Sequence, residues 1–376
     1  MVEIDALMIR VVHVLTRTNI GGPSVMLVDL LEGLDKSRFQ QIVVRGTPDT
    51  AEGDYLSGRE LASEVVTLGG LRRSIGVVSE IATLFRLVGT LRRLQPDIVH
   101  THMAKAGVIG RLAAVIAGVP IRIHTYHGHL LHGYFSPFVT RVFNAVERRL
   151  RRLTAHFFVV GEATRRDLVR ERLITETSST TIMPPARNLR VHERAEARHR
   201  LGLPNERVIV GFVGRLTAIK RPDRFLRLAD SMPEATFVLV GNGPLRNHVV
   251  AQASARANVM VKDWVDDIAL VLSTLDVVVL TSDNEGVPLS LIEAAVVGRP
   301  VVATAIGAVS EIVDHGTTGY VVNDDEGLID AVRRLVVDPE LRKAMGSAAA
   351  SRIGSICSME SYLAAHANVY SRLLAE

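Results

Sequence analysis

The chain has 376 residues, of which 47% are hydrophobic and 22% charged, with 14 prolines and 29 glycines. This composition is that of a globular protein large enough for two domains, and it excludes disorder and collagen-like structure. A single cysteine, Cys357, excludes an intrachain disulfide and a metal site built from cysteines. The net charge is +4, but 25 basic and 17 acidic residues precede residue 191, whereas 19 basic and 23 acidic residues follow it. A basic first half suits nucleic acid, an anionic membrane or an anionic substrate.

Residues 1–16 lack a basic leader and a small-residue cleavage site, and no run of about 18 apolar residues occurs. We therefore expect neither secretion nor a membrane span. With the lone cysteine, this favours the cytoplasm.

The first half predicts strands that alternate with helices. The strand Arg10–Leu15 leads through Gly21-Gly22-Pro23 to a helix for which Ser24 is the expected N-cap. One apolar face of this helix is formed by Leu27, Leu30, Leu31 and Leu34. Further strands are predicted at Gln41–Arg45, Glu64–Leu68, Asp97–His100, Ile121–Thr125 and Ala155–Val160. Further helices are predicted at Val77–Leu94, Lys105–Ala117, Pro137–Leu153 and Glu162–Arg172. This alternation implies a parallel sheet covered on both faces.

The pattern breaks over Thr175–Asn205, which holds Pro184-Pro185 and a charged stretch from Arg187 to Arg200. We place a domain boundary at residue 190. Predicted strands of the second half are Val208–Val213, Thr236–Val240, Val259–Val261, Asp276–Leu280, Val301–Ala303 and Gly319–Val322. Predicted helices begin at Pro222, span Pro288–Val297 and fill the C-terminus. We expect two doubly wound α/β domains, residues 1–190 and 191–355, with a helix at 356–376 packing back on the first. The cleft between the domains is the expected ligand site.

Two basic residues follow the first strand of the second domain. Arg215 comes directly after Gly214, and Lys220 lies five residues further on, where a helix begins. Backbone N–H groups at a helix start favour anions, and a guanidinium beside an ammonium suits a diphosphate. A solvated basic loop is the alternative.

Two carboxylates, Glu285 and Glu293, lie eight residues apart in a loop and the helix after it. Gly286 allows a ligand close to the backbone, and Pro288 suits the start of a helix. Because the neighbours of Glu293 are apolar, its carboxylate needs hydrogen-bond donors, such as ribose hydroxyls or a nearby basic group.

Histidines cluster at two predicted strand ends, as His100-Thr101-His102 and as His124-Thr125-Tyr126-His127-Gly128-His129, with His132 beyond. A metal site is one interpretation, but no carboxylate lies at ligand spacing. Polar contact with a substrate, with one histidine near the reacting centre, is the preferred one. For His100, His102 and His124, the simplest interpretation is that each is a hydrogen-bonded histidine at the end of a strand.

Other nucleotide-binding and hydrolytic motifs are missing. Gly21-Gly22 lacks the GxGxxG pattern, and no acidic residue ends the second strand to hold a ribose, which disfavours nicotinamide and flavin. Neither GxxxxGK[ST] nor GxSxG occurs.

Together these residues resemble the retaining glycosyltransferases of family four, which have the GT-B fold of two Rossmann-like domains facing across a cleft. The strongest similarity is Thr281–Ala295 with Gly298–Thr304, which resembles the EX7E motif and the elements after it. Val213–Leu216 with Lys220 is similar to the phosphate-binding stretch, and Val240–Leu245 to the second nucleotide loop.

The resemblance implies roles for individual residues. Arg215 and Lys220 would bind the donor diphosphate and stabilise its charge, Glu285 would hold hydroxyls of the transferred sugar, and His127 would contact that sugar near the anomeric centre. Glu293 would bind the ribose. The remaining expected donor-site residues are Gly21, Gly22, Gly214, Asn242, Gly243, Pro244, Val265, Gly286, Val287, Pro288 and Leu289. No metal or cofactor is expected.

Two departures from the family pattern stand out. Ile306-Gly307-Ala308 replaces the paired glycines that are common after the strand Val301–Ala303, and Pro23 follows Gly22. We expect these changes to affect the acceptor side and not the phosphate-binding or carboxylate residues.

The resemblance implies transfer of a hexose-type sugar, N-acetylglucosamine or glucose, from a nucleoside-diphosphate sugar to an acceptor hydroxyl, with retention of configuration. UDP is favoured as the commoner donor nucleotide. The acceptor could belong to polysaccharide, glycolipid or natural-product biosynthesis, and nucleic acid is not an expected partner. Alternatives are a GT-B-type epimerase or phosphorylase, and a nucleotide-sugar-binding protein without catalysis.

The segment Arg141–Arg152 is basic and amphipathic. Such a helix can lie on an anionic membrane, which would make the protein peripheral at the inner face. An ordinary packed helix with a solvated basic face is the simpler alternative.

Overall fold

The computed structural model describes residues 8–47, 53–71, 77–128 and 137–376. These residues form two compact units. The first runs to Ile182 and includes Glu360–Glu376, and the second comprises Met183–Met359. The chain thus passes to the second unit earlier than residue 190, at the end of a strand, and returns after the helix that ends at Ile356.

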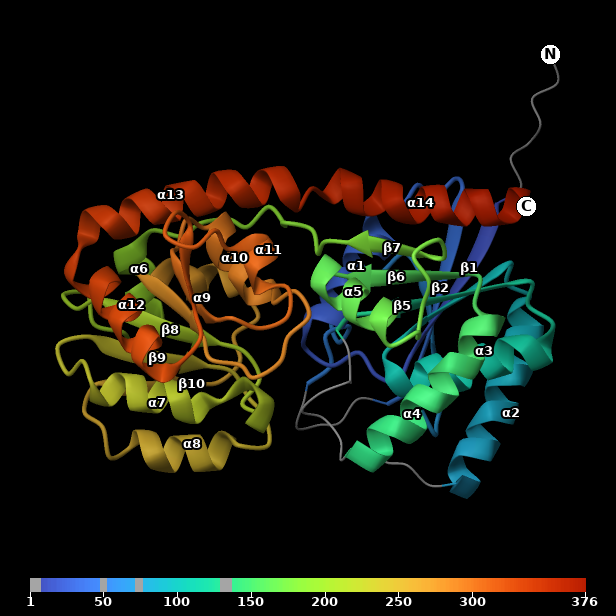
Figure 1. Ribbon diagram of the computed structural model, residues 1–376, viewed down its shortest axis with the longest axis horizontal. Coiled ribbons are helices and arrows are strands. Elements are labelled where there is room, and N and C mark those ends of the chain that lie inside the picture. The colour runs from blue at the N-terminus through green and yellow to red at the C-terminus, as the bar shows by residue number, and fades with distance from the viewer. Residues whose placement is uncertain (1–7, 48–52, 72–76, 129–136) are drawn as a thin grey trace, which may run out of the picture. The chain divides into compact units, whose positions relative to one another are not determined.

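The first unit is built on a seven-stranded sheet (Figure 1). Its strands are β1 (Ile9–Leu15), β2 (Phe39–Arg45), β3 (Glu64–Thr67), β4 (Ile98–His102), β5 (Ile121–Tyr126), β6 (His156–Val160) and β7 (Ser179–Ile182). They follow the order β3-β2-β1-β4-β5-β6-β7, and every neighbouring pair is parallel. Buried valines on both faces of β1 and β2 explain why the sheet needs helices on both sides.

The helices of the first unit are α1 (Gly22–Gly33), α2 (Val77–Leu94), α3 (Ala104–Ala117), α4 (Pro137–Leu150), η1 (Arg151–Leu153), α5 (Glu162–Arg170) and α14 (Met359–Ala375). Ser24 does not cap α1. The helix begins at Gly22 with Gly21 as N-cap, and the Ser24 hydroxyl donates to the carbonyl of Asn19 at 2.7 Å. The leucine face was predicted correctly, because Leu27, Leu30, Leu31 and Leu34 are all buried.

Helix α14 packs on this sheet although it closes the sequence. Its Tyr362 hydroxyl donates to the carbonyl of Met26 at 2.9 Å, and Tyr370 packs edge-on against Phe39. The Tyr370 hydroxyl also lies 2.6 Å from Nδ1 of His100. The last helix therefore closes the core of the first unit.

In the chain up to residue 205, two segments differ from the sequence-based prediction. The helix expected over Pro137–Leu153 ends at Leu150 and continues as the 3-10 turn η1. The stretch Thr175–Asn205 contains the edge strand β7 and the helix α6 (Arg194–Arg200). Sequence patterns missed both because β7 is short and half-buried, and α6 is highly charged. Its Arg198 is fully buried, where it donates to Asp276 at 2.7 Å.

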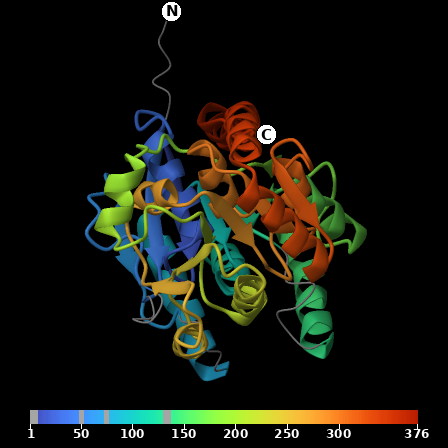
Figure 2. The same cartoon turned by 90° about the vertical axis from the view of Figure 1, so that its left-hand side faces the viewer.

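The second unit has a six-stranded sheet of β8 (Ile209–Val213), β9 (Thr236–Val240), β10 (Val259–Lys262), β11 (Val277–Leu280), β12 (Val301–Thr304) and β13 (Gly319–Val322). The order is β10-β9-β8-β11-β12-β13, again with parallel pairs throughout. Its remaining helices are η2 (Ala218–Lys220), α7 (Pro222–Asp230), α8 (Arg246–Ala253), α9 (Ile268–Thr274), α10 (Leu289–Val296), α11 (Val309–Ile312), α12 (Asp325–Val337) and α13 (Pro339–Ile356). Figure 2 gives a second view of these helices around the sheet.

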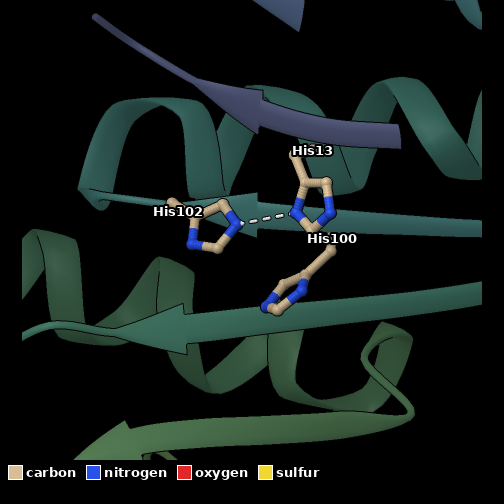
Figure 3. Close-up of side chains that lie close together, drawn as sticks. All are labelled: His13, His100 and His102. Atoms are coloured by element: carbon tan, nitrogen blue, oxygen red, sulfur yellow. Dashed lines mark hydrogen bonds between the residues drawn. The ribbon is translucent and has the colours of Figure 1, made fainter. Parts of the chain in front are cut away.

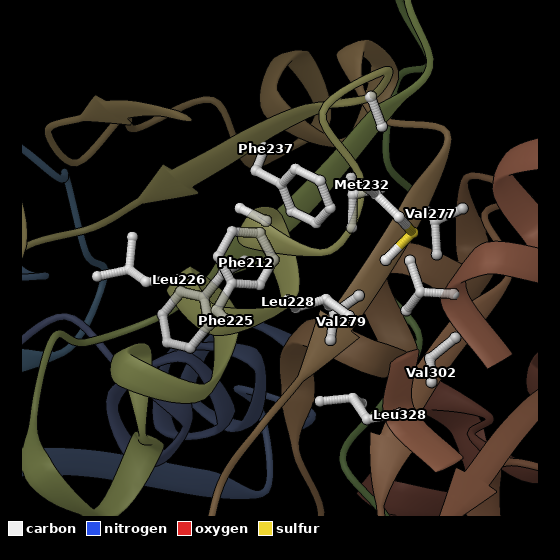
Figure 4. Packing of buried hydrophobic residues seen from close by; sticks show 14 of the residues in the cluster. Phe212, Phe225, Leu226, Leu228, Met232, Phe237, Val277, Val279, Val302 and Leu328 are labelled. Atoms are coloured by element: carbon white, nitrogen blue, oxygen red, sulfur yellow. The ribbon is translucent and has the colours of Figure 1, made fainter. Parts of the chain in front are cut away.

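One hydrophobic core joins the sheet of the second unit to α7, α8 and α12 (Figure 4). Phe225 of α7 packs edge-on against Phe212 of β8 and Phe237 of β9, at ring-centroid distances of 5.8 and 5.5 Å. Gly211 faces the opposite side of β8, where a Cβ atom would lie 2.2 Å from Leu275, just after α9. The helices α8 and α9 were not predicted, because one lacks an apolar face and the other is apolar almost all round.

Both sheets therefore share one strand order, in which the direction of winding reverses beside the first strand. In the first unit the reversal lies between β1 and β4, and in the second between β8 and β11. In sheets of this kind, ligands bind beyond the carboxyl ends of the strands at the reversal point. The loops after these four strands are the places to look for a site.

Candidate functional site

In the second unit, the loops after β8 and β11 are held together by hydrogen bonds. The Thr281 hydroxyl lies 2.9 Å from the carbonyls of both Lys220 and Arg221, and the Asp283 amide donates to the carbonyl of Ile219 at 2.8 Å. The turn η2 is therefore fixed against the end of β11.

This arrangement brings Lys220 and Glu285 together. The Lys220 ammonium donates to Oε1 of Glu285, and the Ser282 hydroxyl donates to the same oxygen at 2.6 Å. Both charged side chains are largely shielded from solvent, at 21% and 11% exposed. Two residues that the sequence predicted for different tasks, phosphate binding and sugar binding, thus form one charged centre at the reversal point.

The glycine loop after β8 pairs with the loop after β9. The amide of Gly214 donates to the carbonyl of Val240 at 3.1 Å, and that of Leu216 to the carbonyl of Asn242 at 2.9 Å. Gly241 has a φ of 150°, and a Cβ atom there would lie 2.0 Å from the carbonyl oxygen of Gly214. Only glycine fits this close approach.

The remaining predicted nucleotide-site residues lie at the same edge of the sheet. Arg215, half-buried, follows Gly214 directly. Gly243 donates its amide to Oδ1 of Asn242 at 2.7 Å, and Pro244 is exposed beside it. Val265 is half-buried in the loop after β10, two strands away from β8.

Glu293 lies on α10 and is 7% exposed. Its Oε1 accepts a hydrogen bond from Arg187, which follows Pro184-Pro185 far earlier in the chain. Burial raises the pKa of Glu293, and the positive charge of Arg187 opposes that rise. The basic partner considered for this carboxylate is thus present. The sequence held no local signal that Arg187 would supply it, because 106 residues separate the two.

The loop between Glu285 and α10 is fixed by the segment after β12. Gly286, Val287 and Pro288 lead to Leu289, where α10 begins, so Pro288 is the N-cap and not a residue of the first turn. Gly307 has a φ of 50°, and a Cβ atom on it would lie 2.0 Å from the carbonyl oxygen of Glu285.

The departure at Ile306-Gly307-Ala308 was expected not to concern the carboxylate residues, and that expectation is wrong. The Ala308 amide donates to the carbonyl of Gly286 at 3.1 Å, and the Thr304 hydroxyl to that of Ser282 at 2.7 Å. This segment therefore braces the backbone that carries Glu285.

In the first unit, the reversal point is lined by Gly21-Gly22 and by histidines of β4 and β5. The two glycines begin α1 after β1, and β4 separates β1 from β5 in the sheet. His127 directly follows β5, at the same edge. His129 and His132 lie outside the described residues.

His100 and His124 are hydrogen-bonded residues of the core. His100 lies 2.6 Å from the hydroxyls of both Tyr370 and Thr125, and Nδ1 of His124 lies 2.9 Å from the Thr101 hydroxyl. Burial lowers the pKa of both histidines well below its ordinary value. The simpler interpretation therefore describes these two residues, and also His102, which is buried at the end of β4 and hydrogen-bonded to two histidines.

Three histidines come close enough together to be considered as metal ligands. A nitrogen of His13, one of His100 and one of His102 lie within 4.8 Å of one another (Figure 3). Nδ1 of His13 is 3.2 Å from Nε2 of His102, and the rings of His100 and His102 are 4.3 Å apart. However, all six ring nitrogens already have hydrogen-bond partners. A metal ion would have to displace several of them, so this donor set fits a metal poorly.

His13 was not identified from the sequence. It lies within β1, is fully buried, and its Nε2 is 3.2 Å from Oε1 of Gln41 on β2. A histidine between the apolar residues Val12 and Val14 was the available signal. Burial lowers the pKa of His13 to about 3, so the ring is neutral.

His127 is joined to this cluster. Its Nε2 lies 3.1 Å from Nδ1 of His102, whereas its Nδ1 is buried without a hydrogen-bond partner among the described residues. Burial lowers the pKa of His127 to about 3. A neutral imidazole with one unpartnered nitrogen is thus presented at the edge where a ligand is expected.

The basic helix α4 does not bury an apolar face. Its buried residues are Asn144, Glu147 and Leu150, while Phe138 is 73% exposed and Val142 is 50% exposed. The face of α4 that packs against the rest of the unit is held by a buried ion pair.

Arg111 of α3 donates to both oxygens of Glu147, at 2.6 and 2.8 Å, and the Tyr126 hydroxyl donates to Oε2 at 2.7 Å. The apolar side chains of Phe138, Val139 and Val142 are left at the surface beside Arg141. Over the described part of the chain, none of the helices has the length and apolar character that crossing a bilayer requires.

Two family models match the chain: a glycosyl transferase 4-like domain over residues 21–185, and glycosyl transferases group 1 over residues 193–352. The UDP-Gal:alpha-D-GlcNAc-diphosphoundecaprenol alpha-1,3-galactosyltransferase of Escherichia coli is 28% identical, over 77% of this chain and 78% of that protein. A D-inositol 3-phosphate glycosyltransferase of Mycobacterium tuberculosis is 30% identical, over 74% of this chain and 62% of that protein.

Among solved structures, Anabaena Alr3699/HepE in complex with UDP and glucose aligns with a TM-score of 0.83 and 20% identity, over 97% of this chain and 100% of that one. This likeness shows the two-domain fold. The two family models fall on the two units, and the relatives are sugar-transferring enzymes. The chain belongs to the GT-B glycosyltransferases of family four.

Proposed function

We propose that this enzyme transfers a hexose-type sugar, glucose or N-acetylglucosamine, from a UDP-sugar to an acceptor hydroxyl and retains the anomeric configuration. The observation that carries the proposal is the pairing of Lys220 with Glu285 beside the Gly214-Arg215 loop. UDP is favoured because the Escherichia coli relative is named for UDP-galactose and the Anabaena structure contains UDP.

The cations of the second unit would stabilise the leaving group. Breaking the bond between the anomeric carbon and the phosphate oxygen leaves negative charge on the diphosphate, and preorganised cations lower the energy of that charge. Arg215 offers a bidentate fork, and Lys220 has three N–H donors, so it can contact phosphate and Glu285 together. We propose that no metal ion takes part.

The two carboxylates would bind different parts of the donor. Glu285 is held by Lys220 and Ser282 and would accept hydrogen bonds from hydroxyls of the transferred sugar. Glu293 uses Oε1 for Arg187, and its Oε2 would accept a ribose hydroxyl. Glu285 is a positioning group here and not a nucleophile, because the leaving phosphate itself would take the proton of the acceptor hydroxyl on the same face.

A lipid-linked saccharide is the acceptor that the surface of the first unit favours. Phe138, Val139 and Val142 are exposed on α4 together with Arg141, a combination suited to an anionic membrane surface. The Escherichia coli relative is named for an acceptor linked to diphosphoundecaprenol. Flotation with anionic vesicles tests this. Salt-sensitive co-migration that is lost in Phe138→Ser supports it, and no co-migration contradicts it.

Thermal unfolding with a panel of UDP, GDP, ADP and NADH tests the donor class. A ligand present at 100 times its dissociation constant stabilises the folded state by about 2.7 kcal/mol. We expect a selective upward shift of Tm with UDP that is lost in Glu293→Ala. Stabilisation by NADH alone would contradict the proposal. Product analysis then separates transfer from epimerisation or phosphorolysis.

A further inference from the structure

We propose that Gln41, His13 and His102 form a hydrogen-bonded relay that fixes the tautomer of His127, so that Nδ1 of His127 is a bare acceptor for a hydroxyl of the bound sugar. The relay runs through β2, β1, β4 and the residue after β5, which puts it across the reversal point of the sheet. That the hydroxyl belongs to the transferred sugar rests on the proposed function, whereas the tautomer of His127 does not.

The relay begins at an amide whose orientation is determined. Nε2 of Gln41 lies 3.3 Å from the carbonyl oxygen of Leu30 and 3.3 Å from that of Leu31, near the end of α1. The Leu31 carbonyl is among the last four of the helix, which have no intrahelical donor. Because a carbonyl can only accept, the NH2 group of Gln41 must point at α1. Its Oε1 then points at His13.

Each following proton position is dictated by the one before. Oε1 of Gln41 can only accept, so Nε2 of His13 carries the proton, and a neutral imidazole has no second proton for Nδ1. Nδ1 of His13 must therefore accept from Nε2–H of His102 (Figure 3). Nδ1 of His102 in turn accepts from Nε2–H of His127. All three rings hold their single proton on Nε2.

Neutrality of the rings is required and is supported by their surroundings. Burial lowers the pKa of His13 and of His127 to about 3, and that of His102 well below its ordinary value. The charged form of each ring is further disfavoured by His366, and that of His102 also by His127, His13 and His124. A proton added to Nδ1 of His13 or of His102 would place two N–H groups face to face.

The end of the relay is an atom that lacks a partner. Nδ1 of His127 is buried and accepts no hydrogen bond from the described residues. A buried acceptor without a donor costs about 1–3 kcal/mol, and a hydroxyl of a ligand would remove that cost. A bare Nδ1 selects a donor group such as a sugar hydroxyl, and it disfavours a carbonyl or phosphate oxygen at the same place.

Nitrogen NMR of the protein labelled with ¹⁵N-histidine tests the tautomer directly, because protonated and bare ring nitrogens differ strongly in chemical shift. The resonances of His127 are identified by their loss in His127→Ala. We expect a protonated Nε2 and a bare Nδ1, unchanged between pH 8 and pH 5.5. A protonated Nδ1 would overturn the proposal. So would stoichiometric zinc in the purified protein that shifts the resonances of His13 and His102.

Variants of Gln41 test the origin of the relay. Gln41→Met removes the acceptor for His13, and we expect a mixture of tautomers at His127. In its protonated form, Gln41→Glu can donate to a carbonyl of α1 and keep an oxygen toward His13, and it should then keep the wild-type pattern. Gln40→Met is the matched control. Gln40 is exposed on the same strand, and among the described residues its side chain hydrogen-bonds only to Arg10. An unchanged His127 tautomer in a folded Gln41→Met variant would contradict the relay.

Kinetics connect the relay to the reaction. Gln41→Met should lower kcat/KM by roughly threefold to tenfold, the worth of one hydrogen bond. This loss should vanish in a His127→Ala background, because the two changes remove the same contact. Equal losses in both backgrounds would assign Gln41 a purely structural role. Without any transfer activity in the wild type, the NMR result still stands, and only the proposed function fails.

Discussion

Neutralising Glu285 perturbs the charged centre of the second unit with little change in shape. The carboxylate accepts hydrogen bonds from Lys220 and from Ser282, at 2.6 Å for the latter. Glu285→Gln keeps an oxygen for these donors and removes the charge. The substitution therefore removes the ion pair between Lys220 and Glu285.

The size of the effect follows from the kind of hydrogen bond that is lost. Hydrogen bonds to a charged group are worth about 1.5–3 kcal/mol, roughly twice the neutral ones. If Glu285 holds sugar hydroxyls more tightly in the transition state, the change raises the barrier by at least about 1.4 kcal/mol, a tenfold fall in kcat. The affinity for UDP should be kept or increased, because Lys220 is released toward the phosphates.

The assay pairs steady-state release of UDP from a UDP-sugar with calorimetric titration of UDP. Asp283→Asn is the matched control, because it neutralises an exposed carboxylate of the same loop that pairs with Arg221 and Arg224. Such surface pairs are worth about 0–1 kcal/mol. An unchanged kcat in Glu285→Gln would refute the assigned role. An equal loss in Asp283→Asn would show that the loop, and not the carboxylate, is responsible.

Three further outcomes are expected. Arg111→Ala leaves the buried carboxylate of Glu147 without its partner, and it should lower the free energy of unfolding in urea by about 3–5 kcal/mol. Arg148→Ala, in a surface pair, should lower it by about 1 kcal/mol or less. Similar losses in the two variants would contradict the assignment of a buried ion pair. Gly307→Ala should lower kcat because its Cβ meets the backbone that carries Glu285, whereas Gly316→Ala, also at positive φ but with open space, should change only Tm. Because the pKa of His13 is about 3 when folded and 6.5 when exposed, the unfolded chain takes up the proton first as pH falls. The unfolding free energy should then drop by about 1.4 kcal/mol per pH unit below 6.5 for this group, and equal values at pH 7 and pH 5 would contradict its burial as a neutral ring.

Much of the fold could be predicted because apolar periodicity reports which segments are buried strands. Thr236–Val240 and Gly319–Val322 match the structure at both ends. Periodicity fails where an element is short, charged or apolar all round, as in β7, α6 and α9. In such segments the secondary structure is determined by tertiary contacts, such as the hydrogen bond from Arg198 to Asp276.

The candidate site was predictable where its residues lie within a local motif. Lys220 and Glu285 were identified separately, and the parallel pairing of β8 with β11 explains why they meet. Arg187 and Gln41 carry no local signal, because each acts through a residue that is distant in the sequence. In the sequence, Gly307 stood out only as part of a departure from the family's glycine pattern. Its structural role follows from the structure, in which a Cβ atom on Gly307 would collide with the carbonyl oxygen of Glu285.

The most direct measurement is proton NMR of the purified enzyme with a UDP-α-sugar, EDTA and water as the default acceptor. The account predicts release of UDP with the α-anomer of the free sugar appearing first, at a rate unaffected by EDTA. First appearance of the β-anomer would contradict retention, and loss of activity in EDTA would contradict charge stabilisation by Arg215 and Lys220 alone. Conversion of the donor to another UDP-sugar would show that the enzyme is not a transferase of the proposed kind.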